Sequence, residues 1–266
     1  MPGSSMDKDK RVALVTGAGS PEGIGFATAR LLGQQGFDIA ITSTTRRIED
    51  RALELSDYGI EALSFSTDLM KLRNVEIFVE RTVERYGRID VLVNNAGMAQ
   101  VSRPEVVKRL AELDEEEWDY RIAISLKTAF NMAKTVLPYM LRAGYGRIVN
   151  VASVTGPIVS NPGMTAYSAA KAAMIGLTKS LALEVAAQGI TVNAVAPGWV
   201  KTGSSTKQEL VAGAHTPLGR PGTPNEVAAL IAFLASENAS YITGEMVVID
   251  GGNTIQEYKG PAELYY

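Results

Sequence analysis

Two hydrophobic patterns alternate along the chain. Short runs rich in β-branched and other apolar residues predict strands, and longer stretches with apolar residues every three or four positions predict helices. The predicted strands are residues 12–15, 38–42, 62–66, 89–93, 147–151, 191–195 and 246–249. The predicted helices are residues 25–35, 48–58, 75–86, 116–141, 166–187 and 225–234. Runs such as IDVLV and RIVNV are nearly continuous in apolar residues, which is typical of parallel strands buried on both faces. The alternation predicts an α/β fold with about seven strands and helices on both faces of the sheet.

One domain accounts for the chain, since the sequence contains no repeat, low-complexity tract or linker. The length of 266 residues suits one large α/β domain, which we place at residues 11–252. Residues 1–10 are predicted to be a disordered start, with MPGSS as a remnant of cloning. Residues 253–266 form a C-terminal tail whose aromatic end is expected either to dock on a neighbouring subunit or to fray.

The composition excludes several kinds of function. The chain has no cysteine and one histidine, His215, which excludes disulfides, cysteine nucleophiles and zinc sites with two imidazoles, so no metal is expected. The formal net charge is −3, so no nucleic-acid or anionic-membrane partner is expected. No apolar run reaches the roughly 20 residues of a membrane span, and the start lacks a signal peptide. A cytoplasmic location is therefore the default prediction.

A glycine-rich turn follows the first predicted strand directly. It reads TGAGSPEGIG, residues 16–25, and leads into a helix. Glycines let the backbone approach a pyrophosphate at a helix N-terminus, so this turn is a candidate dinucleotide-binding segment. A plain tight turn is the alternative. The position at the first strand-to-helix connection of an α/β chain favours the dinucleotide.

Tyr167 and Lys171 are four residues apart and therefore share one face of a predicted helix. Hydride transfer to a carbonyl builds negative charge on its oxygen, which then needs a proton donor. A tyrosine has an ordinary pKa of about 10, and a nearby ammonium lowers that pKa by roughly 1–3 units. The pair fits a phenol that donates in reduction and a phenolate that accepts in oxidation. For the spacing alone, an ordinary helix with a surface Tyr and Lys is the alternative.

Several motifs in one order resemble the short-chain dehydrogenase/reductase family, closest in pattern to its 3-oxoacyl-[acyl-carrier-protein] reductases. They are TGxxxxxGIG, NNAG at residues 94–97, GRIVNVAS, YSAAKAA and the PG segment at residues 197–202, in a resemblance that covers residues 11–252. The glycine-rich turn is two residues longer than the family's TGxxxGxG, and the resemblance implies that its Gly17, Ser20, Ile24 and Gly25 contact the cofactor. The resemblance implies a single-domain, Rossmann-type, doubly wound parallel sheet. It assigns the chemistry to Ser153, Tyr167 and Lys171, with the Ser153 hydroxyl polarising the substrate oxygen.

The same resemblance assigns further cofactor contacts. It implies that Asp68 and Leu69 hold the adenine, that Asn95 lines the cofactor site, and that Val200 and Thr202 meet the nicotinamide carboxamide. Tyr167 and Lys171 are expected to contact the cofactor as well as the substrate.

The end of the second predicted strand decides which dinucleotide is bound. NAD-preferring sites usually carry Asp or Glu there. This chain has TSTTRR at residues 42–47 and no carboxylate before Glu49. Hydroxyls and a guanidinium suit a 2′-phosphate, so Thr44 and Arg46 are predicted to bind NADPH or NADP. NADH or NAD is the alternative, since the arginines can also simply begin a solvated helix and Glu22 disfavours an extra phosphate.

One position departs from the family. The asparagine that usually helps to hold a water for proton relay is replaced by Ser125. Asn131 is not a substitute, because six residues along a helix place it about 240° away. Serine can donate and accept a hydrogen bond, so we predict a catalytic role for Ser125 in a working but altered relay.

Two variable segments are expected to shape the substrate site, residues 98–117 and residues 203–222, the second as a mobile lid. Met98 is expected to form an apolar wall of that site or to pack in the core. Lys207 and Arg220 either attract an acidic substrate or are ordinary surface charges.

The predicted function is NAD(P)H-dependent reduction of a ketone to a secondary alcohol, with hydride from nicotinamide and a proton from Tyr167. A secondary-alcohol or sugar-alcohol dehydrogenase working in the oxidative direction is the alternative. A non-catalytic cofactor-binding sensor is the remote alternative, although such a protein would typically have lost the Tyr or the Lys. The expected partners are a small-molecule ketone or alcohol and further copies of the chain in a homotetramer.

Overall fold

The computed structural model describes residues 10–97, 103 and 107–260. In this part of the chain, seven strands form one parallel sheet in the order β3-β2-β1-β4-β5-β6-β7. The strands are β1 (Val12–Thr16), β2 (Asp38–Ser43), β3 (Ala62–Ser66), β4 (Val91–Asn94), β5 (Gly146–Val151), β6 (Ile190–Pro197) and β7 (Met246–Ile249). The predicted single α/β domain with a Rossmann-type sheet is confirmed. The domain bounds stay a prediction, and residues 1–9 lie outside the described residues.

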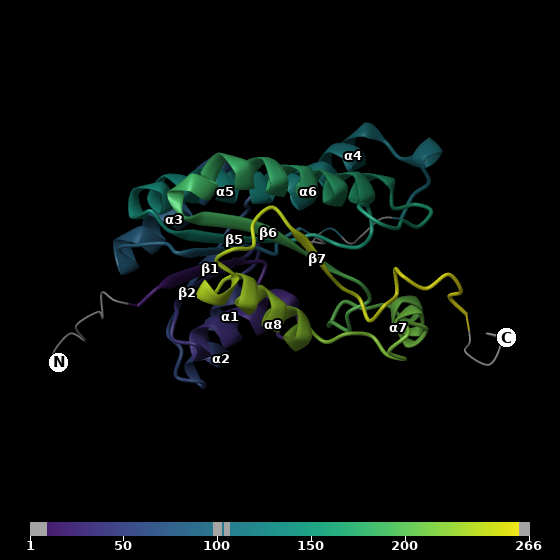
Figure 1. The fold of residues 1–266 in the computed structure, drawn as a ribbon, viewed down its shortest axis with the longest axis horizontal. Coiled ribbons are helices and arrows are strands. Elements are labelled where there is room, and N and C mark those ends of the chain that lie inside the picture. The colour runs from purple at the N-terminus through teal and green to yellow at the C-terminus, as the bar shows by residue number, and fades with distance from the viewer. Residues whose placement is uncertain (1–9, 98–102, 104–106, 261–266) are drawn as a thin grey trace.

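Helices cover both faces of the sheet. They are α1 (Ile24–Gln34), α2 (Arg47–Ser56), α3 (Leu72–Tyr86), α4 (Glu115–Ile122), α5 (Thr128–Ala143), α6 (Thr165–Val185), α7 (Lys207–Ala214) and α8 (Pro224–Leu234). Figure 1 shows α3, α5 and α6 over one face and α1, α2 and α8 over the other, with α7 beside the C-terminal segment.

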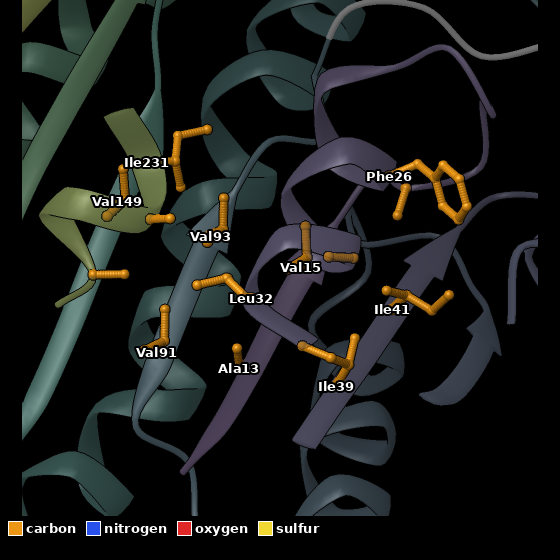
Figure 2. Packing of buried hydrophobic residues seen from close by; sticks show 14 of the residues in the cluster. Ala13, Val15, Phe26, Leu32, Ile39, Ile41, Val91, Val93, Val149 and Ile231 are labelled. Atoms are coloured by element: carbon orange, nitrogen blue, oxygen red, sulfur yellow. The ribbon is translucent and has the colours of Figure 1, made fainter. Parts of the chain in front are cut away.

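Alternate residues of the strands supply two cores. Leu14 of β1 is buried with side chains of α3, α5 and α6. Its neighbour Val15 is buried on the opposite face with side chains of α1, α2 and α8. Figure 2 shows this second core, where Phe26 and Leu32 of α1 lie over Val15 and the neighbouring strands. Burial on both faces explains why the strands are almost continuously apolar.

The order of the strands brings two connections together. The chain runs outward from β1 through β2 to β3 and then returns to β4 on the other side of β1. β1 and β4 pair in parallel, with Val15 opposite Val93. In open sheets of this kind, ligands bind beyond the carboxyl ends of the strands at such a switch point. The glycine-rich turn after β1 and the NNAG segment after β4 meet there.

Two segments differ from their predicted form. The helix expected at residues 116–141 is interrupted, because a π-helical turn, Ala123–Lys127, joins α4 to α5. The segment predicted to be a lid, residues 203–222, contains the helix α7, whose N-terminus is closed by a capping box between Thr206 and Glu209.

Candidate active site

The glycine-rich turn packs directly on the segment after β4. Gly17 has φ of +69°, in the left-handed region that favours glycine. A Cβ added at Gly17 would lie 2.8 Å from the Cα of Ala96, and one at Gly25 would lie 2.5 Å from Nδ2 of Asn95. The Asn95 amide donates to the carbonyl oxygens of Thr16 at 2.9 Å and of Gly17 at 3.1 Å. The glycines therefore permit a close contact, and Asn95 fixes it.

The N-terminus of α1 suits an anion. Gly23 is its N-cap residue, no described side chain caps it, and its first turn contains no acidic residue. The backbone N–H groups at Ile24 and Gly25 have no earlier helical turn to bond to, so they are available to a ligand. Ser20 lies on the same turn, where its carbonyl oxygen accepts from the Gly23 N–H at 3.1 Å. This uncapped end and the glycine cradle fit the pyrophosphate of a dinucleotide.

Basic side chains lie between the end of β2 and the glycine-rich turn. Thr44 and Arg46 are exposed, and Arg46 directly precedes α2. Arg47 comes closer, since a Cβ added at Gly19 would lie 2.7 Å from its Nε. Nη1 of Arg51 lies 3.5 Å from the Gly19 carbonyl oxygen. Arg46 is the contact predicted from the sequence, whereas Arg47 and Arg51 are further candidates whose spacing of four residues places both on one face of α2.

The connection after β3 is held by α5. Oδ1 of Asp68 accepts from the N–H of Met70 at 3.0 Å, and Leu69 is buried. Nδ2 of Asn131 donates to the Leu69 carbonyl oxygen at 2.8 Å. Asn131 therefore supports the connection that carries Asp68 and Leu69, a role separate from that expected of Ser125.

Lys171 is buried at the carboxyl end of β5. Its Nζ donates to the Val151 carbonyl oxygen at 2.7 Å and lies 5.7 Å from the centre of the Tyr167 ring. Burial lowers the pKa of Lys171 from 10.5 to about 8. Oγ of Ser153 accepts from the N–H of Thr155 at 3.0 Å, a contact that does not use the hydroxyl hydrogen. Ser153, Tyr167 and Lys171 are thus gathered at the end of one strand.

Ser125 lies within the π-helical turn and is buried. Its hydroxyl donates to the Gly97 carbonyl oxygen at 2.7 Å. Gly97 has φ of +142°, and a Cβ added there would lie 3.0 Å from the Cα of Ser125. Ser125 therefore ties the π-helical turn to the NNAG segment. Because its hydroxyl hydrogen is used in this bond, any relay through Ser125 uses the acceptor lone pairs of the oxygen.

Backbone and side-chain bonds hold together the two ends of the segment predicted to be a lid. An isolated parallel bridge joins Val200 to Gly222. The Ser205 hydroxyl donates to the Val200 carbonyl oxygen at 3.0 Å and accepts from the Thr202 N–H at 2.9 Å. Val200 and Thr202, the expected nicotinamide contacts, are therefore held in a compact turn at the start of the lid.

The two basic residues considered as substrate contacts differ. Arg220 donates to both carboxylate oxygens of Glu226, at 2.7 and 3.0 Å. The hydrogen bonds from Arg220 and from Thr223 lower the pKa of Glu226 to about 2. The Arg220 guanidinium is therefore already engaged, whereas Lys207 is exposed at the first position of α7.

The C-terminal tail lies against the end of α7. Nε2 of Gln256 donates to the carbonyl oxygen of His215 at 2.9 Å, and His215 directly follows α7. Met98 and the aromatic end of the tail, residues 261–266, lie outside the described residues.

The fold and the site together define a class of protein. A glycine cradle lies at the switch point of a parallel sheet, and a tyrosine beside a buried lysine lies at a neighbouring strand end, which is the arrangement of a nicotinamide-dependent oxidoreductase. Among the described residues, no cluster of three or more acidic or histidine side chains could hold a metal ion. Within the same residues, no helix has the length and apolar character needed to cross a membrane.

Comparison with known proteins identifies the family. The family model described as Enoyl-(Acyl carrier protein) reductase matches residues 17–254. The 3-oxoacyl-[acyl-carrier-protein] reductase FabG of Thermotoga maritima is 41% identical over 262 residues, which cover 94% of this chain and 100% of the relative. The oxidoreductase UcpA of Salmonella typhimurium is 40% identical, with 93% of this chain and 95% of the relative covered. The crystal structure of acetoin dehydrogenase YohF from Salmonella typhimurium matches with a TM-score of 0.83 and 36% identity, over 95% of this chain and 99% of that one. This chain belongs to the short-chain dehydrogenase/reductase family, as the motifs predicted.

Proposed function

We propose that this chain reduces a ketone to a secondary alcohol with NADPH and that Tyr167 donates the proton. The observation that carries the proposal is the buried ammonium of Lys171, whose Nζ lies 5.7 Å from the centre of the Tyr167 ring. A cation at this distance favours phenolate over phenol and so makes the tyrosine a better proton donor. A lysine on an ordinary surface helix would extend into solvent, whereas Lys171 is 4% exposed.

Each side chain has one task in this reaction. The nicotinamide, when bound, supplies the hydride. The Ser153 hydroxyl donates a hydrogen bond to the substrate oxygen and stabilises the charge that develops there. The Tyr167 phenol gives its proton to that oxygen, and the Lys171 ammonium, held by the Val151 carbonyl, stabilises the phenolate that remains. Ser125 accepts a hydrogen bond in the relay that returns a proton to the tyrosine.

The same proposal assigns the dinucleotide to the carboxyl ends of the strands. The residues that would hold it are Gly17, Ser20, Ile24, Gly25, Thr44, Arg46, Asp68, Leu69, Asn95, Tyr167, Lys171, Val200 and Thr202. To these we add Arg47, because its guanidinium reaches the glycine-rich turn at Gly19. No carboxylate occurs between the end of β2 and Glu49 to repel a 2′-phosphate, which supports NADPH over NADH.

The cofactor preference has a direct test. Arg47→Ala is expected to raise the KM for NADPH about tenfold or more and to leave the KM for NADH nearly unchanged, since a hydrogen bond to a charged group contributes about 1.5–3 kcal/mol. Arg46→Ala is expected to act in the same direction. Arg73→Ala in α3, where the arginine pairs with Glu76 on the surface, is the matched control. Equal changes in the KM values for NADPH and NADH would refute the preference.

A substrate panel tests the reaction itself. Oxidation of NADPH and NADH is followed against acetoacetyl thioesters, cyclic ketones and keto-sugars, with Tyr167→Phe as the control. Activity that disappears in Tyr167→Phe supports the proposal, and the best ketone defines the substrate class. Absence of turnover with every ketone while NADPH still binds would favour the non-catalytic sensor.

Alcohol oxidation is the second candidate function, because the phenolate of Tyr167 can accept the proton that the phenol donates in reduction. The similarity to a protein named acetoin dehydrogenase favours testing it. Reduction of NADP or NAD is measured with secondary alcohols, sugar alcohols and acetoin. A larger kcat/KM for an alcohol than for its ketone would assign the oxidative direction.

We also propose that the chain is a cytoplasmic homotetramer assembled through α5 and α6. Phe130 of α5 and Leu183 of α6 are 45% and 86% exposed, and exposed apolar side chains on long helices suit a subunit contact. Light scattering is expected to give the mass of four chains, and Leu183→Arg is expected to lower it. A monomeric wild-type chain would refute the assembly, and cell fractionation tests the location.

A further inference from the structure

The first residue of the lid lies on the glycine-rich turn. A Cβ added at Gly203 would lie 3.1 Å from Oε2 of Glu22 and 3.5 Å from Oγ of Ser20. Ser20 and Glu22 belong to the part of the turn that makes it two residues longer than TGxxxGxG. The extra length therefore brings the turn close to the lid.

Gly203 is fixed relative to the residues before it. The Ser205 hydroxyl bonds to both Val200 and Thr202, and the Ser205 N–H donates to the Thr202 carbonyl oxygen at 3.1 Å. These bonds close a tight turn around Gly203. The closeness of Glu22 to Gly203 consequently places the expected nicotinamide contacts, Val200 and Thr202, near the glycine-rich turn.

No ion pair explains the position of the Glu22 side chain. Glu22 is exposed, and it has no salt bridge to any described residue. In the proposed function, the turn that carries Glu22 binds the pyrophosphate and the segment before Gly203 binds the nicotinamide. Glu22 and Gly203 thus lie where two segments approach each other that would hold neighbouring parts of one dinucleotide, its pyrophosphate and its nicotinamide.

We infer that Glu22 is a positioning residue that forms, with Gly203, a strap between the glycine-rich turn and the lid, and that this strap parts when the dinucleotide enters or leaves. The inference rests on the proposed dinucleotide-dependent function. The longer turn would then determine how fast the dinucleotide exchanges. That exchange is a separate step from the proton transfer at Tyr167.

The chain itself allows the strap to be locked. A Cβ added at Gly203 would lie 3.7 Å from the Cβ of Glu22, which is within the range of about 3.5–4.5 Å found in disulfides. Because the natural chain has no cysteine, Glu22→Cys combined with Gly203→Cys creates one unambiguous pair. The oxidised double variant, loaded with NADPH before oxidation, is expected to release it at least about tenfold more slowly than the reduced form in stopped-flow fluorescence. Dithiothreitol is expected to restore release, and each single cysteine variant is the control.

A second variant removes the strap. Deletion of Pro21 and Glu22 converts the turn to TGAGSGIG, the shorter length, and is expected to release NADPH several-fold faster. The measurement is made in about 0.5 M salt, which screens the loss of the Glu22 charge. Failure of the disulfide to form, release from the cross-linked form at the reduced rate, or unchanged release after the deletion each overturns the inference. If the unmodified chain binds neither NADPH nor NADH, the proposed function fails first and this inference fails with it.

Discussion

Lys171→Met is expected to stabilise the fold at neutral pH while removing turnover. Lys171 is buried, and burial lowers its pKa from 10.5 to about 8. At about 1.36 kcal/mol per pKa unit, keeping this ammonium charged in the interior costs about 3 kcal/mol of folding free energy. The methionine side chain has a similar length and no charge to desolvate.

One interaction offsets part of this gain. Nζ of Lys171 donates to the Val151 carbonyl oxygen at 2.7 Å, and a hydrogen bond to a charged group contributes about 1.5–3 kcal/mol. The variant loses that bond, so the net stabilisation is expected to be about 1 kcal/mol. For a chain of this size, such a change raises the Tm by roughly 2–4 °C.

The pH dependence distinguishes this explanation from better packing. Below pH 8 the ammonium is charged in both the folded and the unfolded chain, so the whole penalty is present in the wild type. Between about pH 8 and pH 10.5 the folded chain loses the proton first, and the penalty declines until it is absent above 10.5. The advantage of Lys171→Met is therefore greatest at neutral pH and decreases as the pH rises through this window.

Thermal melts of wild type and Lys171→Met across this range measure the effect. Lys179→Met replaces an exposed lysine on the same helix and is the control. Ketone reduction by Lys171→Met is expected to fall by about 10²-fold or more, the usual contribution of positioned acid–base groups. A variant less stable than wild type at neutral pH, or a stabilisation independent of pH, would refute the desolvation argument. Retained turnover would refute the role of the ammonium.

Three further changes test the site. Ser125→Ala leaves the Gly97 carbonyl oxygen without its hydrogen-bond donor, so the free energy of unfolding is expected to fall by about 1–2 kcal/mol and ketone reduction to slow. Urea unfolding measures the first effect and the pH–rate profile the second. An unchanged pH–rate profile would show that Ser125 takes no part in the reaction. Gly25→Ala places a Cβ 2.5 Å from Nδ2 of Asn95, so NADPH binding measured by fluorescence titration is expected to be lost, and full affinity would remove the glycine cradle from the site. Arg220→Ala is expected to change the KM for an acetoacetyl thioester by less than about twofold, because its guanidinium already pairs with a carboxylate; a large increase in that KM would make Arg220 a substrate contact.

The sheet could be predicted from the sequence because its signal is local. Residues on both faces of β1 and β4 are buried, and both strands are apolar except for Thr16 and Asn94 at their carboxyl ends. The same holds for the glycine-rich turn, since the close approach at Gly17 and Gly25 admits no side chain. A structural feature that only one residue type can satisfy is therefore predictable from the sequence.

The π-helical turn could not be predicted in this way. Residues 123–127 continue an ordinary helical pattern, and the segment that the wider turn contacts is distant in the chain. Gly97 lies against Ser125, whose hydroxyl bonds to the Gly97 carbonyl oxygen. Helix α7 is different, because the capping box between Thr206 and Glu209 is a local signal that is visible in the sequence.

The charges near the two variable segments show why membership of the family does not by itself identify the substrate. Arg103 pairs with Glu117 at 2.7 Å in the segment before α5, and Arg220 pairs with Glu226 at the end of the lid. Both guanidinium groups are therefore neutralised by partners within this chain. Attraction of an acidic carrier protein would have to overcome these pairs, whereas a small uncharged ketone would not disturb them. The similarity to 3-oxoacyl-[acyl-carrier-protein] reductases thus supports the chemistry at Tyr167 more strongly than it supports a carrier-bound substrate.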